Sequence, residues 1–212
     1  MRGENRFDTE ELRQYAENHL SREVELLRWT GSFLNAFSTA SLSSERIAGD
    51  IADAFQRSAL ESFGMHARNL IDFLYVRNYY HSDWPTDIVI EDYVSDSVIS
   101  TKLIPITETL KDARIKADKL IAHLTVERET FGFYQKAWMY TFIAIDLLNA
   151  LRSIANEIPA PLKSNRFLEA ISTSLPLLFD IDLRQYSLED RRGPGLAMEF
   201  GMWYQPDSYK QP

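Results

Sequence analysis

Two short stretches of the sequence concentrate the side chains that could do acid–base chemistry. The first, residues 113–125, holds Arg114, Asp118, Lys119 and His123 within about two and a half helical turns. An imidazole exchanges a proton near neutral pH, and a guanidinium or ammonium group stabilises a developing negative charge. These residue types predict chemistry on a phosphodiester, with His123 as the general base and the cations stabilising the transition state.

The second stretch, residues 62–75, is also an apolar helical segment, and it carries His66, Arg68, Asn69 and Asp72. If the helices formed by the two stretches are neighbours, their polar side chains meet in one mixed cluster. In that cluster we expect Arg68 to share the catalytic role, and the amide, carboxylate and imidazole of this stretch to contact the substrate.

A purely structural role is the alternative for the same residues. Arg68 and Asp72 are four residues apart, as are Arg114 and Asp118, which is the spacing of an ion pair within one helix. His123 falls near the expected end of its helix, where the helix dipole stabilises a positive charge. Under this interpretation the two stretches hold a bundle together and do no chemistry.

A metal centre is not expected. The chain has no cysteine, and no histidine follows a glutamate by three residues, as di-iron bundles require. His123, Glu127 and His66 could converge on a zinc ion. An ordinary polar layer explains them more simply, so we expect neither a metal nor a cofactor. The sequence also has no nucleophile elbow and no glycine loop suited to phosphate.

Composition sets the class of protein. The 212 residues are 45% hydrophobic and 25% charged, with a net charge of −8. This balance is typical of a folded globular chain and argues against a broad basic surface for nucleic acid, although a local basic pocket stays open. The sequence shows neither a signal-peptide pattern nor an apolar run long enough to span a bilayer. We therefore expect a soluble, cytoplasmic protein without a membrane partner.

The elements that must position these residues are helices. Asp8 and Glu11 form a capping-box pattern, and Thr30 with Gly31 predicts a kink or break in the helix that follows. We expect an all-α fold, an up-and-down bundle of four to five long helices with an irregular C-terminal extension. The bundle domain would span residues 1–190 and the Gly/Pro/aromatic tail residues 191–212. The expected helices begin and end near residues 8–37, 44–79, 107–124, 137–158 and 164–174. Ser43 or Ser44 is expected to cap the second of them and Thr107 the third. An irregular segment at 87–100 would pack Ile88, Ile90 and Tyr93 onto the bundle.

ESFGMHARNLIDFLY (residues 61–75), followed by KADKLIAHLT (residues 116–125), resembles the core of the HEPN-like helical proteins. That superfamily includes toxin and abortive-infection ribonucleases, and the resemblance spans about residues 45 to 155. The family motif is an arginine, a polar residue, a short gap and a histidine. Here His123 matches, Lys119 takes the polar position, and Asp118 stands where the family has arginine.

The resemblance implies a metal-independent endoribonuclease, or a protein that binds RNA or a nucleotide, of a toxin–antitoxin or defence type. Its implied pocket contains His123, Lys119, Arg68 and Asn69. The competing hypothesis is a non-catalytic helical interaction module. Under either hypothesis we expect a homodimer. The aromatic residues expected in the core or in the dimer interface are Trp29, Phe33, Phe37, Trp138, Tyr140 and Phe142, and the apolar tail either contacts another subunit or docks on its own chain.

Overall fold

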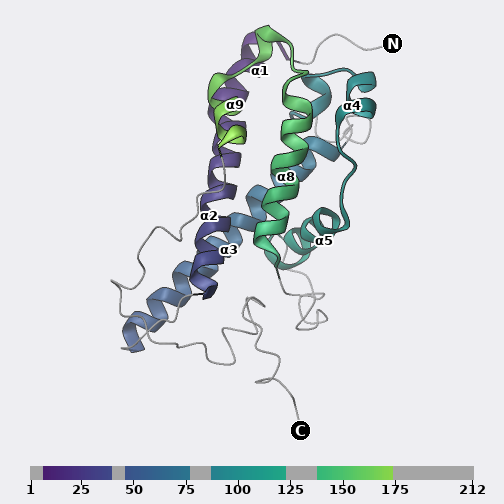
Figure 1. Ribbon diagram of the computed structural model, residues 1–212. Helices are drawn as coiled ribbons and strands as arrows, with labels where there is room; N and C mark the ends of the chain where they lie inside the picture. Colours follow the sequence, from purple (N-terminus) through teal and green to yellow (C-terminus); the bar gives the residue numbers. More distant parts are fainter. Residues whose placement is uncertain (1–6, 40–45, 77–86, 123–137, 174–212) are drawn as a thin grey trace.

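The computed structural model describes residues 7–39, 46–76, 87–122 and 138–173, with side chains at 7–35, 54–76, 87–121 and 138–173. All regular structure in these ranges is helical, which confirms the predicted all-α class (Figure 1). The elements in chain order are α1 (Thr9–Tyr15), the π-helix η1 (Ala16–Leu20), α2 (Ser21–Thr39), α3 (Arg46–Tyr75), the 3-10 helix η3 (Ile90–Asp92), α4 (Asp96–Lys102), α5 (Glu108–Lys116), the π-helix η4 (Ala117–Ala122), α8 (Tyr140–Ala155), the 3-10 helix η5 (Ala160–Leu162) and α9 (Asn165–Ser172).

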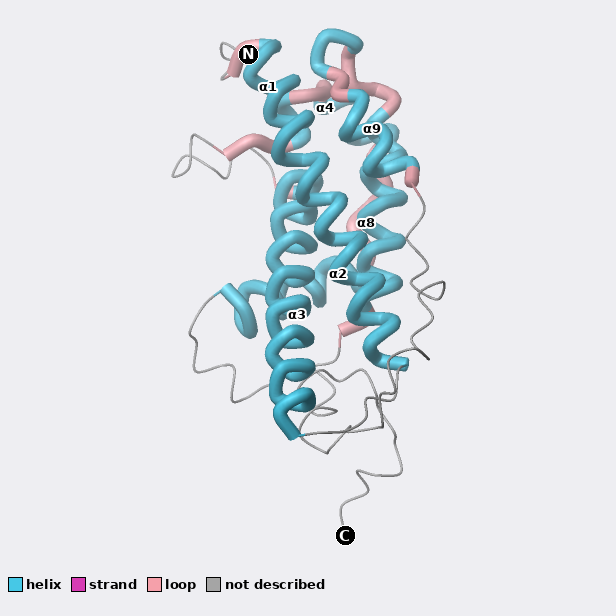
Figure 2. The backbone as a smooth tube through the Cα atoms, turned by 90° about the vertical axis from the view of Figure 1, so that its left-hand side faces the viewer, coloured by secondary structure: helices cyan, strands magenta, loops and turns pink. Residues whose placement is uncertain are grey.

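The long helices alternate in direction, as an up-and-down bundle requires. Gly31 of α2 lies against Phe63 of α3, while Glu23, nearer the start of α2, accepts a hydrogen bond from Asn69, nearer the end of α3. Helices α2 and α3 therefore run antiparallel. The helix formed by α5 and η4 returns antiparallel to α3, and α8 then runs antiparallel to α2, where Thr141 hydrogen-bonds Asn35. Figure 2 shows α2, α3 and α8 side by side along the long axis, with α9 packed beside α2 and α8. The buried side chains form one core cluster that includes Leu27, Leu34, Phe63, Leu70, Ile71, Leu74, Leu110, Leu147, Leu148 and Phe167.

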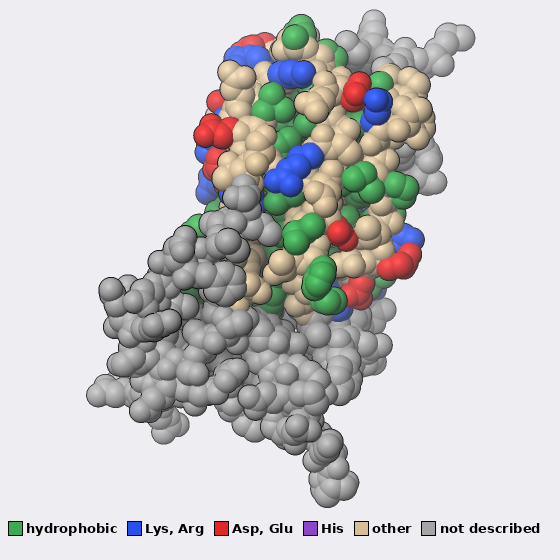
Figure 3. All heavy atoms as spheres, viewed as in Figure 1, with side chains coloured by type: hydrophobic (Ala, Val, Ile, Leu, Met, Phe, Trp, Pro, Cys, Tyr) green, Lys and Arg blue, Asp and Glu red, His purple; other side chains and the backbone are tan. Residues whose placement is uncertain are grey.

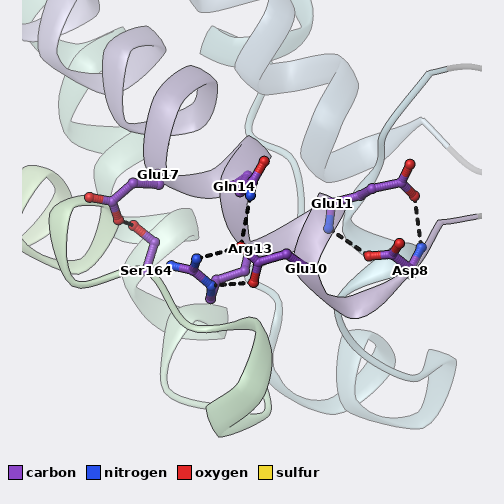
Figure 4. A network of polar contacts seen from close by, with 7 residues as sticks. All are labelled: Asp8, Glu10, Glu11, Arg13, Gln14, Glu17 and Ser164. Atoms are coloured by element: carbon purple, nitrogen blue, oxygen red, sulfur yellow. Dashed lines mark hydrogen bonds and ion pairs between the residues drawn. The ribbon is translucent and has the colours of Figure 1, made fainter.

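Side-chain caps begin three of these helices. At α1 the Asp8 carboxylate accepts from the Glu11 amide at 2.8 Å, and the Glu11 carboxylate accepts from the Asp8 amide at 2.9 Å (Figure 4). The predicted capping box is therefore confirmed. The Thr107 hydroxyl caps α5, as predicted, and the Ser164 hydroxyl caps α9. Ser164 also donates to Glu17 of η1, which joins the start of α9 to the N-terminal helix (Figure 4).

The predicted break at Thr30 and Gly31 is wrong, because α2 runs through both positions as one helix. The Thr30 hydroxyl donates to the Leu26 carbonyl at 2.6 Å, inside the helix. Gly31 serves packing, since a Cβ there would lie 3.0 Å from the ring of Phe63. The irregularity lies earlier, at the π-helix Ala16–Leu20, so α1, η1 and α2 form one continuous helical rod.

Boundaries elsewhere differ from the expectation by a few residues. Helix α3 ends at Tyr75 and not near Tyr79, and its predicted serine cap at residues 43–44 lies outside the described residues. The segment 87–102 packs Ile90 and Tyr93 into the core, as expected, and then forms α4. The predicted tail and the end of the predicted domain fall in residues 174–212, also outside the described part of the chain.

The aromatic residues divide between core and surface. Trp138 and Tyr140 are buried, as expected for core residues. Trp29 is 56% exposed and stacks on Phe33, and Phe142 on α8 is 58% exposed. Figure 3 shows hydrophobic side chains at the surface over α8, interspersed with charged groups. Among the described residues, no helix is both long enough and apolar enough to cross a membrane.

Candidate functional site

The two stretches singled out from the sequence are neighbours in the bundle. Helix α3 packs against both α5 and η4. Arg68 and Asp72 of α3 meet Arg114 and Asp118, which come from α5 and η4. These four residues, called the Arg/Asp quartet below, form a closed ring of two cations and two anions.

The shortest contacts in the quartet cross between helices. Arg68 Nε lies 2.5 Å from Asp118 Oδ1, and Arg114 Nε donates to Asp72 Oδ1 at 2.6 Å. The predicted contacts within each helix are also present, but they are longer, at 3.8 Å for Arg68–Asp72 and 3.7 Å for Arg114–Asp118. The Arg68–Asp118 contact is an ion pair whose two buried atoms lack hydrogen-bond alignment. The quartet therefore joins the two helices more than it stabilises either one.

The neighbouring aspartates favour the charged form of Arg114. Burial acts to lower the pKa of Arg114, but the hydrogen bond to Asp72 and the charges of Asp72 and Asp118 outweigh it. The pKa of Arg114 is therefore raised above its ordinary value, and this side chain is a permanent cation. A permanent cation cannot exchange protons, so Arg114 could act in a reaction only by stabilising negative charge. Its guanidinium already donates a hydrogen bond to the Asp72 carboxylate.

A glycine makes the close approach of η4 to α3 sterically possible. A Cβ at Gly64 would lie 2.2 Å from Cδ1 of Ile121 on η4 and 3.2 Å from the Trp138 ring. Gly64 is one helical turn from Arg68, so this close contact lies next to the ion pair of Arg68 with Asp118. Packing at Gly64 and ion pairing at Arg68 are thus parts of the same interface.

His66 and Asn69 do not join the quartet. They face α2, where His66 Nδ1 lies 2.7 Å from Glu23 Oε2 and Asn69 Nδ2 donates to the same oxygen at 3.2 Å. The predicted substrate-binding residues therefore differ in their partners, since Asp72 pairs with Arg114 of α5 while His66 and Asn69 contact Glu23 of α2. Glu23 is the residue that connects them to α2.

Lys119 and His123 belong to the end of the first stretch. Lys119 is half-buried on η4, next to Asp118 of the quartet. His123, the predicted general base, lies outside the described residues. The structure thus brings Arg68, Asp72 and Arg114 together and leaves the position of the predicted base untested.

A pocket of about 350 Å³ opens beside the quartet, between the N-terminal rod, α3 and the segment 87–89. Three predicted residues line it, namely Arg68, Asn69 and Asp72. The other polar lining residues are Tyr15, Glu23 and Asp87, and the apolar walls come from Leu20, Leu70, Phe73, Ile88 and Val89. Burial raises the pKa of the Tyr15 hydroxyl, and the charges of Glu23 and Asp87 raise it further, which places a negative potential at this end.

Sequence reasoning missed Tyr15, Glu23 and Asp87 as pocket residues. Each looks ordinary in the chain, because Tyr15 and Glu23 lie on an amphipathic helix and Asp87 lies in a turn-rich loop. No motif marks them, and only the packing of distant segments brings them together. Among the described residues, no group of three or more His, Cys, Asp or Glu side chains is placed to hold a metal ion.

Comparisons with protein-family models, with curated proteins and with solved structures find no match to this chain.

Proposed function

We propose that this chain is a non-catalytic α-helical interaction module in which the Arg/Asp quartet is structural. The observation that carries the proposal is the pairing of both candidate guanidinium groups with aspartates, at 2.5 and 2.6 Å. Stabilising a phosphodiester transition state needs donors directed at the substrate oxygens. Here the shortest contacts of Arg68 and Arg114 are directed at carboxylates, so binding a phosphate would first require breaking the contact between two helices.

Exposed apolar side chains support an interaction role. Phe142 and Ile145 are 58% and 40% exposed and share one side of α8, since they are three residues apart. Trp29 on the neighbouring helix α2 is equally exposed. Large exposed apolar groups on adjacent helices are typical of association surfaces. The module would use this surface to form a homodimer.

Sedimentation equilibrium of the full chain tests the dimer. We expect a dimer whose dissociation constant rises at least about tenfold in Phe142→Ser, the loss of one well-packed aromatic contact. Ile115→Ser is the matched control, because Ile115 is 52% exposed on α5. A monomer at all concentrations would refute self-association through α8, as would equal weakening by both variants.

A HEPN-like metal-independent endoribonuclease is the second candidate. The resemblance of residues 61–75 and 116–125 to that family supports it. The test incubates the protein with a mixed RNA pool without metal, beside His123→Ala and, as control, His19→Ala. Cleavage that is lost only in His123→Ala would replace the first proposal by this one. Identical RNA patterns for all three proteins would retain the interaction module.

A further inference from the structure

The pocket beside the quartet has the size and construction of a ligand site. Its volume of about 350 Å³ falls within the range typical of small-molecule pockets, roughly 300 to 1,000 Å³. Three separate segments of the chain build it: the N-terminal rod through Tyr15 and Glu23, α3 through Asn69, and the loop through Asp87. Apolar walls combined with a few convergent polar groups are the usual composition of such sites.

One irregular helix lines this pocket, and a second contacts one of its lining residues. The π-helix η1 (Ala16–Leu20) contributes Leu20 to the lining, and the π-helix η4 (Ala117–Ala122) contributes the Asp118 that holds Arg68 at the pocket wall. Insertions of π geometry are rare and occur frequently at functional sites. This observation concerns the backbone and is independent of the charges in the pocket.

The charge of the lining selects the class of ligand. Glu23, Asp72 and Asp87 supply three carboxylates, and Arg68 supplies one guanidinium, so the formal balance is −2. Arg68 and Asp72 are each also paired outside the lining, with Asp118 and Arg114 respectively. A phosphate or a nucleic-acid strand would meet repulsion here, whereas a positively charged group would meet acceptors from α2 and from the loop.

We propose that this pocket binds a small organic cation, an amine with a short hydrocarbon body. The ammonium group would bind at the end formed by Glu23 and Asp87, and its hydrocarbon chain would lie along Leu20 and Ile88. The Tyr15 hydroxyl and the Asn69 amide each carry an oxygen that can accept from the same cation. The proposal goes beyond the interaction module and does not depend on it, because the pocket and the exposed side of α8 involve different residues.

Isothermal titration calorimetry of the full chain tests the proposal, with spermidine as the probe. Hexane-1,6-diol is the uncharged control, and MgCl₂ controls for general attraction to an acidic protein. We expect saturable spermidine binding that persists at about 0.15 M salt, where surface attraction is screened. Glu23→Gln and Asp87→Asn should each weaken it on the order of tenfold, the usual effect of losing a charged hydrogen-bond partner.

Two further variants make the result specific. Glu169→Gln removes an exposed carboxylate from α9, outside the pocket, and should leave spermidine affinity unchanged. Ile88→Trp fills the pocket without changing its charge and should abolish binding. Asp87 is exposed in a loop, so its variant decides the test even if Glu23→Gln unfolds. The proposal is overturned if spermidine gives no saturable heat, if Mg²⁺ binds equally well, or if Glu169→Gln weakens binding as much as Asp87→Asn.

Discussion

The two polar sides of α3 differ in how their charges are balanced. Toward α5 and η4, Arg68 and Asp72 meet Arg114 and Asp118, and each cation has an anion within 2.6 Å. Toward α2, His66 and Asn69 meet the single carboxylate of Glu23. The first side is electrically closed, whereas the pocket between α3 and the N-terminal rod, which Arg68 and Asp72 also line, has more carboxylates than cations. Residues only a few positions apart in sequence therefore serve different purposes, and charge balance distinguishes the structural side from the side that can take a ligand.

The largest expected effect comes from separating η4 from α3. Gly64→Val would place side-chain atoms where Ile121 and the Trp138 ring now lie, and overpacking of this kind costs roughly 3 kcal/mol. We expect the free energy of unfolding in urea to fall by about that amount. Glu61→Val, at an exposed position on the same helix, controls for the helix propensity of valine. Equal losses in the two variants would mean that the close approach at Gly64 contributes nothing.

The second effect compares the two sides directly. Asp118→Asn leaves Arg68 without its nearest counterion, and we expect a loss of roughly 2 kcal/mol in the free energy of unfolding, because the pair is partly buried. Glu23→Gln retains a hydrogen-bonding group beside Asn69, so we expect a loss of about 1 kcal/mol or less. Chemical denaturation at neutral pH measures both variants. A larger loss in Glu23→Gln would reverse the assignment of the structural side.

Alkaline pH probes the C-terminal end of α3. Burial raises the pKa of Tyr75, and the negative charge of Asp146 adds a smaller increase. The pKa is about 12 in the folded protein, above the unfolded value of about 10. The folded state therefore retains this proton more strongly, and its stabilising contribution is full below pH 10 and is lost as the pH rises from about 10 to 12. Denaturation curves at pH 9 and pH 11 should differ less in Tyr75→Phe than in the parent chain. A parent chain with identical curves at both pH values would contradict the shift.

The smallest effect concerns the apolar contact of α3 with α8. The hydroxyl of Tyr140 is buried without a hydrogen-bond partner in the described structure, and its ring packs edge-on against Phe63. In thermal denaturation, Tyr140→Phe should leave the free energy of unfolding unchanged or raise it by up to about 1 kcal/mol. Tyr93→Phe is the matched control, because the Tyr93 hydroxyl donates to the Leu12 carbonyl at 2.8 Å. That control should lose about 1 kcal/mol, and a comparable loss in Tyr140→Phe would point to a partner for its hydroxyl.

The features that sequence reasoning predicted correctly are mostly local. The capping box of Asp8 and Glu11 and the cap at Thr107 depend on residues three apart, so the sequence contains all the information they need. The all-α class and the helix period follow from apolar spacing in the same way. The proximity of the two polar stretches was a condition of the predicted site, and the packing of α3 against α5 and η4 meets it.

The features that were missed depend on packing between distant segments. Arg68 pairs most closely with Asp118, and Arg114 with Asp72, across the two helices. Predicting these pairs requires the distance between η4 and α3, which a spacing of four residues within one helix does not give. The break predicted at Thr30 and Gly31 was wrong, because Gly31 instead leaves room for the ring of Phe63. Glu23 was missed because its partners lie 43 and 46 residues further along the chain.

Helix α9 shows what anchoring at both ends does to a short element. Its eight residues would be marginal as an isolated helix in water. At its start, the Ser164 hydroxyl donates a hydrogen bond to Glu17. At its end, Arg28 of α2 donates to the Ala170 carbonyl, and Arg152 of α8 donates to the Ile171 carbonyl. Because those arginines belong to two different core helices, α9 cannot fray without breaking bonds to both. Its amide hydrogens should therefore exchange with solvent at the rate of the core helices, as part of one cooperative unit.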